Sequence, residues 1–170
     1  MSTIPTLETP RLRLRPWRPD DAAAYRALCA DAEVMRFLGG ALGEEEAWRQ
    51  MAMLVGHWAL RGFGSWVVEE RESGRFVGRM GLHHPAGWPD RELAYALGRE
   101  WWGRGYGVES GRAALRYAFS ELGWARVVSY IDPDNINSAR LAERLGARPD
   151  GTVELKGHRL NVYAHDPSAR

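Results

Sequence analysis

A glycine-rich segment between a strand-like run and a helix-like run constrains the fold of this chain more than any other feature. Residues 92–97 form an alternating, apolar run, and helical periodicity begins near Val108. Between them, glycines occupy every second position: Gly103, Gly105 and Gly107. Because glycine has no Cβ, the backbone amides here can turn tightly and approach a ligand closely. Free amides at a helix N-terminus favour an anion, so we expect a phosphate-bearing ligand here, beside Arg99 and Arg104.

The spacing of these glycines excludes two common phosphate-binding loops. A Walker A loop requires a Lys followed by Ser or Thr after its last glycine, whereas Val108 and Glu109 follow here. A dinucleotide-binding loop requires Gly-x-Gly-x-x-Gly near the start of a βαβ unit, and this segment has a different register past mid-chain. A nucleotide-binding kinase is therefore disfavoured. A strand-to-helix turn that is merely tight remains the alternative interpretation.

The loop resembles the pyrophosphate loop of the GNAT acyltransferases, whose signature is Gln/Arg-x-x-Gly-x-Gly/Ala. Gly105 and Gly107 match the last two fixed positions of that signature, and Trp102 stands where Gln or Arg is usual. A Trp-Gly-Arg/Lys-Gly-Tyr version is familiar in one branch of the family, which resembles the ribosomal-protein N-terminal (alanine) acetyltransferases. The loop of this chain is similar to that version.

A second segment, residues 132–146, resembles the other cofactor-binding motif of the same family. In that motif, Asn-x-x-Ser precedes a short helix that ends in Leu-Gly, and Asn135, Ser138 and Gly146 match it. Asn and Ser are also natural helix N-caps. The two motifs occur in the family's order, and the Arg-Leu alternation of residues 11–15 extends the resemblance over nearly the whole chain.

The periodicities predict alternating strands and helices. Strands are expected at 6–17, 65–69, 76–83, 92–97 and 126–131, with closing strands within 151–164. Helices are expected at 22–30, 31–37, 44–61 and 108–122, with a further short helix ending at Gly146. The resemblance implies a three-layer α+β GNAT fold over a single domain, 1–170. Its central sheet is mixed and mostly antiparallel, with a splayed parallel strand pair and helices on both faces.

The composition excludes several classes of function. A net charge of +1 on 170 residues lacks the concentrated basic face that a nucleic-acid partner requires. Cys29, in a helical pattern, is interpreted as a small core residue, and a single cysteine fits a reducing compartment. Residues 1–10 lack the apolar region of a signal peptide, and residues 51–60 are too short to span a membrane. We expect a cytoplasmic protein without a membrane partner.

No metal site is expected. The adjacent His83 and His84 would point to opposite faces of a strand, so they cannot bind one metal together.

The resemblance implies acetyl transfer from acetyl-coenzyme A (acetyl-CoA) to a primary amine, either of a protein N-terminus or of a small molecule. It places the pantetheine amides against the strand before the loop, the diphosphate on the loop, and the thiol end near the second motif. The residues implied are Tyr95, Ala96, Leu97, Trp102, Gly103, Arg104, Gly105, Tyr106, Gly107, Val108, Asn135 and Ser138. A module that binds acyl-CoA without turnover is the alternative.

Direct transfer requires a base for the amine and an acid for the departing thiolate. Glu92 occupies a position that carries a glutamate base in several GNAT enzymes, and partial burial would raise its pKa towards neutrality. The alternative is an ion pair between Glu92 and Arg91. Many relatives place a Tyr acid where this chain has Ala142. Ser138 is the substitute that we favour, with a water molecule, or a capping role for Ser138, as alternatives.

The sequence does not identify the acceptor amine. The resemblance places the helices of residues 31–61 beside the acceptor pocket, so we expect contacts from Phe37 and Trp58, with Trp88 as a third candidate. A strongly cationic acceptor would favour an acidic pocket, for which residues 44–46, 69–70 and 90 are the candidates. Trp88 and the C-terminal strands are also a possible homodimer surface.

Overall fold

Eight strands form one sheet in the computed structural model, which describes residues 4–168. The spatial order is β1-β2-β3-β4-β5-β6-β8-β7. The strands are β1 Leu7–Glu8, β2 Leu12–Arg15, β3 Ser65–Glu70, β4 Phe76–His83, β5 Glu92–Leu97, β6 Val127–Ile131, β7 Arg148–Leu155 and β8 His158–His165. Only β5 and β6 are parallel neighbours among these strands, which confirms the mixed, mostly antiparallel sheet.

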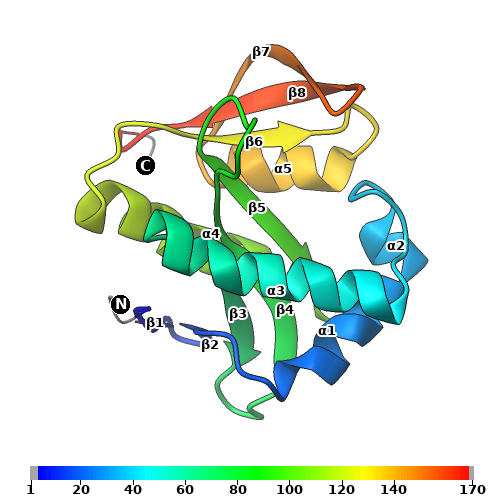
Figure 1. Cartoon of the computed structure of the whole chain (residues 1–170). Coiled ribbons are helices and arrows are strands. Elements are labelled where there is room, and N and C mark those ends of the chain that lie inside the picture. Colours follow the sequence, from blue (N-terminus) through cyan, green and yellow to red (C-terminus); the bar gives the residue numbers. More distant parts are fainter. Residues whose placement is uncertain (1–3, 169–170) are drawn as a thin grey trace.

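Helices cover both faces of the sheet, as the resemblance implied. They are α1 Asp21–Ala30, α2 Ala32–Met35, α3 Glu44–Arg61, η1 Arg99–Trp101, α4 Tyr106–Arg116, η2 Tyr117–Glu121 and α5 Ile136–Arg144. Figure 1 shows α3 crossing in front of the strands, with α4 passing behind. Leu28 of α1 and Leu54 of α3 share one apolar cluster with Ala96 of β5, whereas Ala114 of α4 packs in another with Leu93. Alternate side chains of β5 therefore enter different layers.

The parallel pair β5 and β6 separates almost as soon as it forms. Its single register contact joins Glu92 to Val128, whose N–H donates to the carbonyl of Arg91 at 2.8 Å. The hydroxyl of Ser129 reaches the carbonyl of Leu93 at 3.2 Å. Beyond this point β5 descends away from β6 (Figure 1). Because backbone groups alternate sides along a strand, the N–H and C=O of Tyr95 are directed into the resulting gap.

The N-terminal strand differs from the expectation. Instead of one strand over 6–17, the chain makes two short antiparallel strands that place Leu7 opposite Leu14. The turn between them is closed by Thr9, whose N–H donates to the carbonyl of Leu12 and whose hydroxyl oxygen accepts from the N–H of Leu12. Pro10 has no N–H for a strand ladder, which is the physical reason for a turn at this point. Leu12 and Leu14 are fully buried, so the Arg-Leu alternation is that of a core strand.

Two helices also differ in detail. The apolar residues of α3 are only partly covered: Leu54 and Trp58 are buried, whereas Trp48 and Val55 are 64% and 42% exposed. The helix contacts the sheet over a face too narrow to cover every apolar position. The expected helix 108–122 becomes a π-type turn after Arg116, in which the N–H of Leu122 reaches the carbonyl of Tyr117 at 3.1 Å.

Candidate active site

The glycine loop presents free amides at the start of α4. Gly103 and Gly105 have φ values of 73° and 79°, a conformation that disfavours other residues. The first intrahelical bond runs from the N–H of Glu109 to the carbonyl of Gly105, at 3.0 Å. The N–H groups of Tyr106, Gly107 and Val108 therefore have no partner within the helix. This is the anion-binding arrangement expected from the sequence.

The N-terminal turn fixes this loop, which the sequence analysis did not foresee. Arg11 donates through Nη1 to the carbonyl of Arg104 at 2.9 Å, and through Nε to Glu109 at 2.7 Å. The hydroxyl of Thr9 also donates to Glu109, at 2.7 Å. Burial alone would raise the pKa of Glu109, but hydrogen bonds from Thr9 and Arg11 outweigh it and lower the pKa. An acidic residue in the first turn of a predicted helix was the available signal.

The three strand residues expected to bind pantetheine differ in whether their backbone groups are free to form hydrogen bonds. Ala96 lies opposite Arg79 of β4, and strand alternation directs its backbone groups towards β4 rather than into the gap. The carbonyl of Leu97 faces the gap but accepts the indole N–H of Trp102 at 2.7 Å. Tyr95 is therefore the residue among these three whose backbone N–H and C=O both remain open to the gap.

Gly107 has a packing role that the motif did not reveal. A Cβ at Gly107 would lie 3.0 Å from Leu141 of α5, and one at Gly111 would lie 2.8 Å from Leu145. The two glycines thus let α5 pack closely against α4. At the start of α5, the side chain of Asn135 accepts from the N–H of Ser138 at 3.2 Å, which confirms the predicted N-cap.

Tyr95 and Ser138 join the two sides of the gap. Their hydroxyl groups form a hydrogen bond between β5 and α5. Burial raises the pKa of Tyr95 to about 12, so the phenol keeps its proton at neutral pH. Ala142, at the position of the usual tyrosine, is only 1% exposed. The sequence analysis named Tyr95 for its backbone alone and missed its side chain, because the contact with Ser138 depends on tertiary packing.

Glu92 lies where β5 and β6 diverge. Its carboxylate accepts the indole N–H of Trp88 at 2.7 Å. Burial raises the pKa of Glu92 to about 7, although the hydrogen bond from Trp88 opposes this. Among residues 4–168, no ion pair includes Glu92, and the guanidinium of Arg91 lies 4.4 Å from the ring centre of Trp124. The alternative Glu92–Arg91 pair is therefore not formed.

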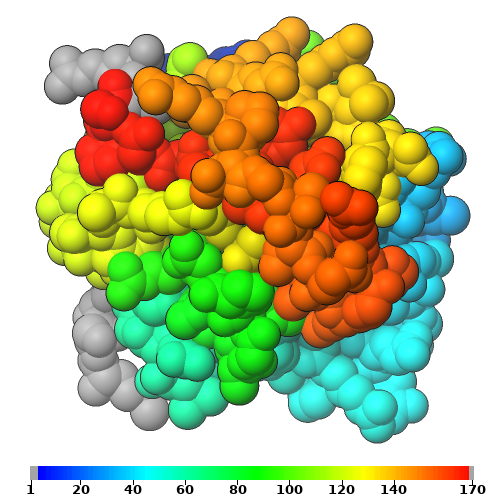
Figure 2. All heavy atoms as spheres, turned by 90° about the horizontal axis from the view of Figure 1, so that it is seen from above, coloured from blue at the N-terminus to red at the C-terminus, as the bar shows by residue number. Residues whose placement is uncertain are grey.

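Two loops meet beside Glu92. Lys156, in the turn between β7 and β8, places its ammonium 4.7 Å from the ring centre of Trp88. Figure 2 shows this hairpin in orange and red against the green loop of residues 84–91. Trp88 is half-buried beside Glu92. Of the other aromatic candidates, Phe37 is half-buried after α2, whereas Trp58 is 6% exposed and packs on Trp66 in the core.

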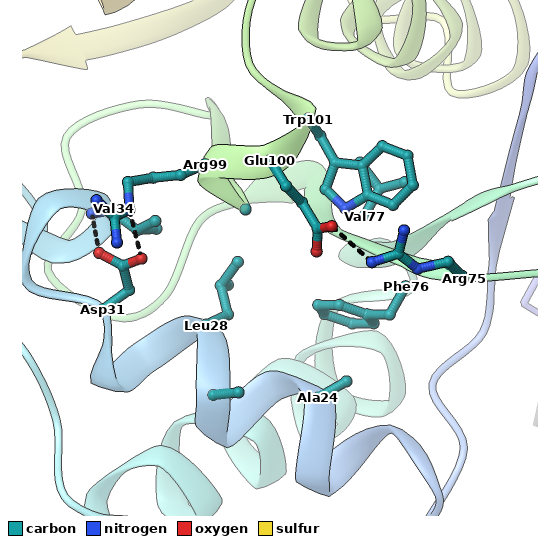
Figure 3. Close-up of a pocket in the computed structure, with 12 residues that line it drawn as sticks. Ala24, Leu28, Asp31, Val34, Arg75, Phe76, Val77, Arg99, Glu100 and Trp101 are labelled. Carbon is teal, nitrogen blue, oxygen red and sulfur yellow. Dashed lines mark hydrogen bonds and ion pairs between the residues drawn. The ribbon is translucent and has the colours of Figure 1, made fainter.

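A separate hollow of about 550 Å³ lies between α1 and η1 (Figure 3). Its lining includes Ala24, Ala27, Leu28, Val34, Phe76, Val77 and Trp101. Two ion pairs lie across it, Arg99 with Asp31 at 2.7 Å and Arg75 with Glu100 at 2.5 Å. Arg99, which was expected beside a phosphate, is thus paired with Asp31, and Arg104 lies over the ring of Trp101.

Comparison with known proteins decides the family. Residues 11–148 match the family described as Acetyltransferase (GNAT) domain. This chain belongs to the GNAT acetyltransferases. YoaA, an uncharacterized N-acetyltransferase of Bacillus subtilis (strain 168), is 32% identical over 156 residues, which cover 88% of this chain and 86% of YoaA.

Solved GNAT structures agree with this assignment. An acetyltransferase from Agrobacterium tumefaciens str. C58 superposes with a TM-score of 0.88 at 32% identity, covering 97% of this chain and 96% of that one. RimL, a ribosomal L7/L12 alpha-N-protein acetyltransferase in complex with coenzyme A, has the same fold. It is 19% identical, with a TM-score of 0.78 over 98% of this chain and 100% of RimL.

GNAT acetyltransferases use acetyl-CoA as the acetyl donor, and this chain is an acetyl-CoA-dependent acyltransferase. Its open strand edge at Tyr95 and the free amides of Tyr106 to Val108 fit the amide and diphosphate groups of such a donor. Across residues 4–168, no group of three or more His, Cys, Asp or Glu is placed to hold a metal ion. In the same range, no helix is long and apolar enough to cross a membrane.

Proposed function

We propose that this GNAT acetyltransferase moves the acetyl group of acetyl-CoA directly to a primary amine, with Glu92 as the base. The observation that carries the proposal is the placement of Glu92 at the mouth of the gap between β5 and β6. Its pKa of about 7 leaves a large fraction of the carboxylate ionised at neutral pH. A base with such a pKa can accept a proton in water and still be basic enough to help the amine react.

The donor would lie along the gap between the two strands. The backbone of Tyr95 would pair with the pantetheine amides as an added strand would, and the amides of Tyr106, Gly107 and Val108 would bind the diphosphate. With the diphosphate at the C-terminal end of β5, the thioester reaches the opposite end, where Glu92 lies. The loop anchored by Arg11 keeps this distance constant.

In the proposed reaction, a C–N bond to the acceptor replaces the C–S bond of the thioester. Glu92 accepts a proton from the acceptor ammonium, directly or through a water molecule, and frees the nitrogen lone pair. The nitrogen attacks the thioester carbonyl carbon, a C–N bond forms, and the C–S bond breaks. The departing thiolate takes a proton from the hydroxyl of Ser138, which is replenished from Tyr95 through their hydrogen bond. The second proton of the nitrogen returns through water to Tyr95, and Glu92 releases to solvent the proton that it accepted, so both groups regain their starting states.

An acceptor screen tests this function. The protein is incubated with acetyl-CoA and single primary amines, and both free coenzyme A and the acetylated amine are quantified by mass spectrometry. We expect the two products in equal amounts, because direct transfer leaves no acetyl group on the protein. Binding of acetyl-CoA without consumption in the presence of any amine would contradict catalysis, and an acetylated protein intermediate would contradict direct transfer.

A further inference from the structure

Arg79, in the middle of β4, is a buried cation that no carboxylate neutralises. The residue is 8% exposed, and its Nε has no hydrogen-bond partner within residues 4–168. None of the ion pairs among the described residues includes Arg79, and its guanidinium interacts with the neutral hydroxyl of Tyr25. A buried charge without a counter-charge is costly, so such a residue is rarely retained for stability alone.

The sheet places Arg79 on the same floor as Glu92. In the antiparallel register of β4 and β5, Arg79 lies opposite Ala96, Gly81 opposite Ala94, and His83 opposite Glu92. Residues directly opposite each other share one face of a sheet. Ala96 packs with residues of α1 and α3, so this is the face that those helices cover.

Between Arg79 and Glu92 the sheet is low and partly exposed at Ala94, whereas the buried Gly81 is covered by the backbone of Gly64 and Ser65. Gly81 and Ala94 are the residues between the two charges, and neither has a side chain beyond Cβ. Ala94 is partly exposed although it lies in a central strand, and Glu92 is partly exposed as well. Arg79 is close enough to lower the pKa of both Glu92 and His83 electrostatically. A small molecule on Ala94 would therefore lie within reach of the guanidinium and of the carboxylate.

The charge around this floor is positive. Lys156 adds a second cation, which also affects the pKa of Glu92. Burial lowers the pKa of His83 to about 3 and lowers the pKa of His57, so both imidazoles are neutral at pH 7. Both charged side chains that act on the pKa of Glu92 among residues 4–168, Arg79 and Lys156, are cations.

The acidic residues considered for a cationic acceptor are occupied elsewhere. Glu44 pairs with Arg26 at 2.6 Å, and Glu45 with Arg49 at 2.6 Å. The remaining acids have partners too: Glu46 accepts from Gly43, Glu69 pairs with Arg13 and Arg15, Glu70 accepts from Ser73 and Tyr106, and Asp90 pairs with Arg126. A polyamine or an aminoglycoside would thus meet no acidic pocket here.

We infer that Arg79 binds a carboxylate of the acceptor, so that the substrate is a small amine that also carries an acid group, as amino acids do. This inference rests on the proposed acetyl transfer at Glu92 and specifies its acceptor. The amine would be presented to Glu92 and the carboxylate to Arg79, across Ala94. The acceptor would then supply the counter-charge that the free protein lacks.

The first test compares matched acceptors with the wild-type enzyme. Each of several α-amino acids, together with ω-amino acids of increasing chain length, is assayed beside its amide and beside the amine that lacks the carboxyl group. We expect kcat/KM to be about 10- to 100-fold higher for the acids, the range for a hydrogen bond to a charged group. Among the ω-amino acids, one chain length should be preferred, because both binding groups are held by the same sheet.

The second test removes the guanidinium. Arg79→Gln should abolish the preference for acids over amides, chiefly through KM. Acids and amides are compared well above the acidic limb of the pH profile, because loss of the guanidinium also raises the pKa of Glu92. Arg49→Gln, in an exposed pair on α3, is the matched control and should keep the wild-type preference. Arg79→Met should not lower the melting temperature of the free protein, because it removes an uncompensated buried charge. Arg79→Lys, which keeps the charge, should retain part of the preference if the other variants fold poorly.

The outcomes separate the two proposals. Equal acetylation of acids, amides and simple amines by the wild-type enzyme overturns the carboxylate site and leaves acetyl transfer standing. A preference for acids that persists in Arg79→Gln likewise overturns the assignment to Arg79. If none of the amines is acetylated although acetyl-CoA binds in calorimetry, the proposed function fails together with the inference.

Discussion

Individual side chains in this enzyme acquire their chemistry from their immediate partners. Burial raises the pKa of Glu92 to about 7, and the hydrogen bond from Trp88 limits the rise. In the proposed mechanism Ser138 is the acid, and the hydroxyl of Tyr95, hydrogen-bonded to it across the gap, would supply its proton. Both pairs join residues of different elements or loops, so each function depends on packing around one or two atoms.

Replacing Glu92 by Gln should remove the base with little change in shape. We expect kcat/KM to fall by about 10²- to 10⁴-fold, the contribution typical of general base catalysis. In the wild type, activity should decrease as the pH falls through about 7, because protonation of Glu92 removes the base. The measurement is a pH profile of kcat/KM, with acetyl-CoA affinity as the control. A variant that keeps the acidic limb of this profile would exclude Glu92 as the base.

Trp88→Phe should move that limb without removing the base. The indole N–H stabilises the ionised carboxylate and so lowers the pKa of Glu92. Its loss should raise that pKa, and the acidic limb should shift upwards by about one pH unit, as expected for a hydrogen bond to a charged group. Trp48→Phe, on the exposed face of α3, is the control. An unshifted limb would show that the hydrogen bond does not form in solution.

At the scale of elements, the site is formed by the N-terminal ends of two helices and the edge of one strand. Contacts between residues far apart in the sequence hold these parts together. The strand edge of β5 is open because β6 leaves it after one residue pair. The start of α4 is held by the turn between β1 and β2, through Arg11 and Glu109. The start of α5, which carries Ser138, is brought close by the glycines of α4.

Glu109→Gln should loosen the loop while keeping the side-chain volume. The substitution weakens three hydrogen bonds from Thr9 and Arg11 to the charged carboxylate, one of which comes from the guanidinium of Arg11. We expect the dissociation constant of coenzyme A to rise by about tenfold, since such bonds contribute about 1.5–3 kcal/mol each. Isothermal calorimetry gives this value, and the exposed Glu121→Gln is the control. Unchanged affinity would mean that the turn does not order the loop.

Two glycine-to-alanine substitutions test the packing of α4 against α5. Gly111→Ala places a Cβ 2.8 Å from Leu145 and should destabilise the protein by about 1–3 kcal/mol. Gly56→Ala, in α3 with open space around it, should instead stabilise by about 0.5–1 kcal/mol, because alanine is the better helix former. Urea unfolding of both variants measures the difference. Equal effects would refute close packing at Gly111.

At the scale of the whole molecule, a buried ion network joins the N-terminal half to the sheet. Arg15 of β2 pairs with Asp21 of α1 at 2.7 Å and with Glu69 of β3 at 2.6 Å. All three side chains are at least nine-tenths buried. Through this network, α1, which helps to cover the proposed acceptor floor, is held to β2 and β3 of the same sheet.

Arg15→Met should leave the buried Asp21 without its cation and Glu69 with Arg13 alone. Loss of one partner from a buried ion pair costs about 3–5 kcal/mol, so we expect a decrease of this size in the free energy of unfolding. Arg13→Met removes a half-exposed partner of Glu69 and should cost about 1 kcal/mol or less. Urea denaturation compares the two variants. Similar losses would indicate that the Arg15 network is hydrated in solution.

Much of the fold was predictable because its signals are local. Alternation identified β3, β4 and β5, and helical periodicity with Gly62 after its end identified α3. Features that depend on contacts between distant residues were not predictable. The break between β1 and β2 depends on the turn at Thr9, and the exposure of Trp48 depends on how much of α3 the sheet covers. The position of Glu92 was predictable from its place before the loop. The hydrogen bond from Trp88 was not.

The sequence by itself determined which segments are strands, helices and glycine turns, and it identified the family through two motifs. Those features depend on residues near one another along the chain, where backbone sterics and hydrogen-bond spacing act. The tertiary structure alone decided that Tyr95 meets Ser138, that Arg11 holds the loop, and that Arg79 is buried without a counter-charge. Burial and charge pairing depend on what surrounds an atom in space, and these neighbours come from elements that only folding brings together.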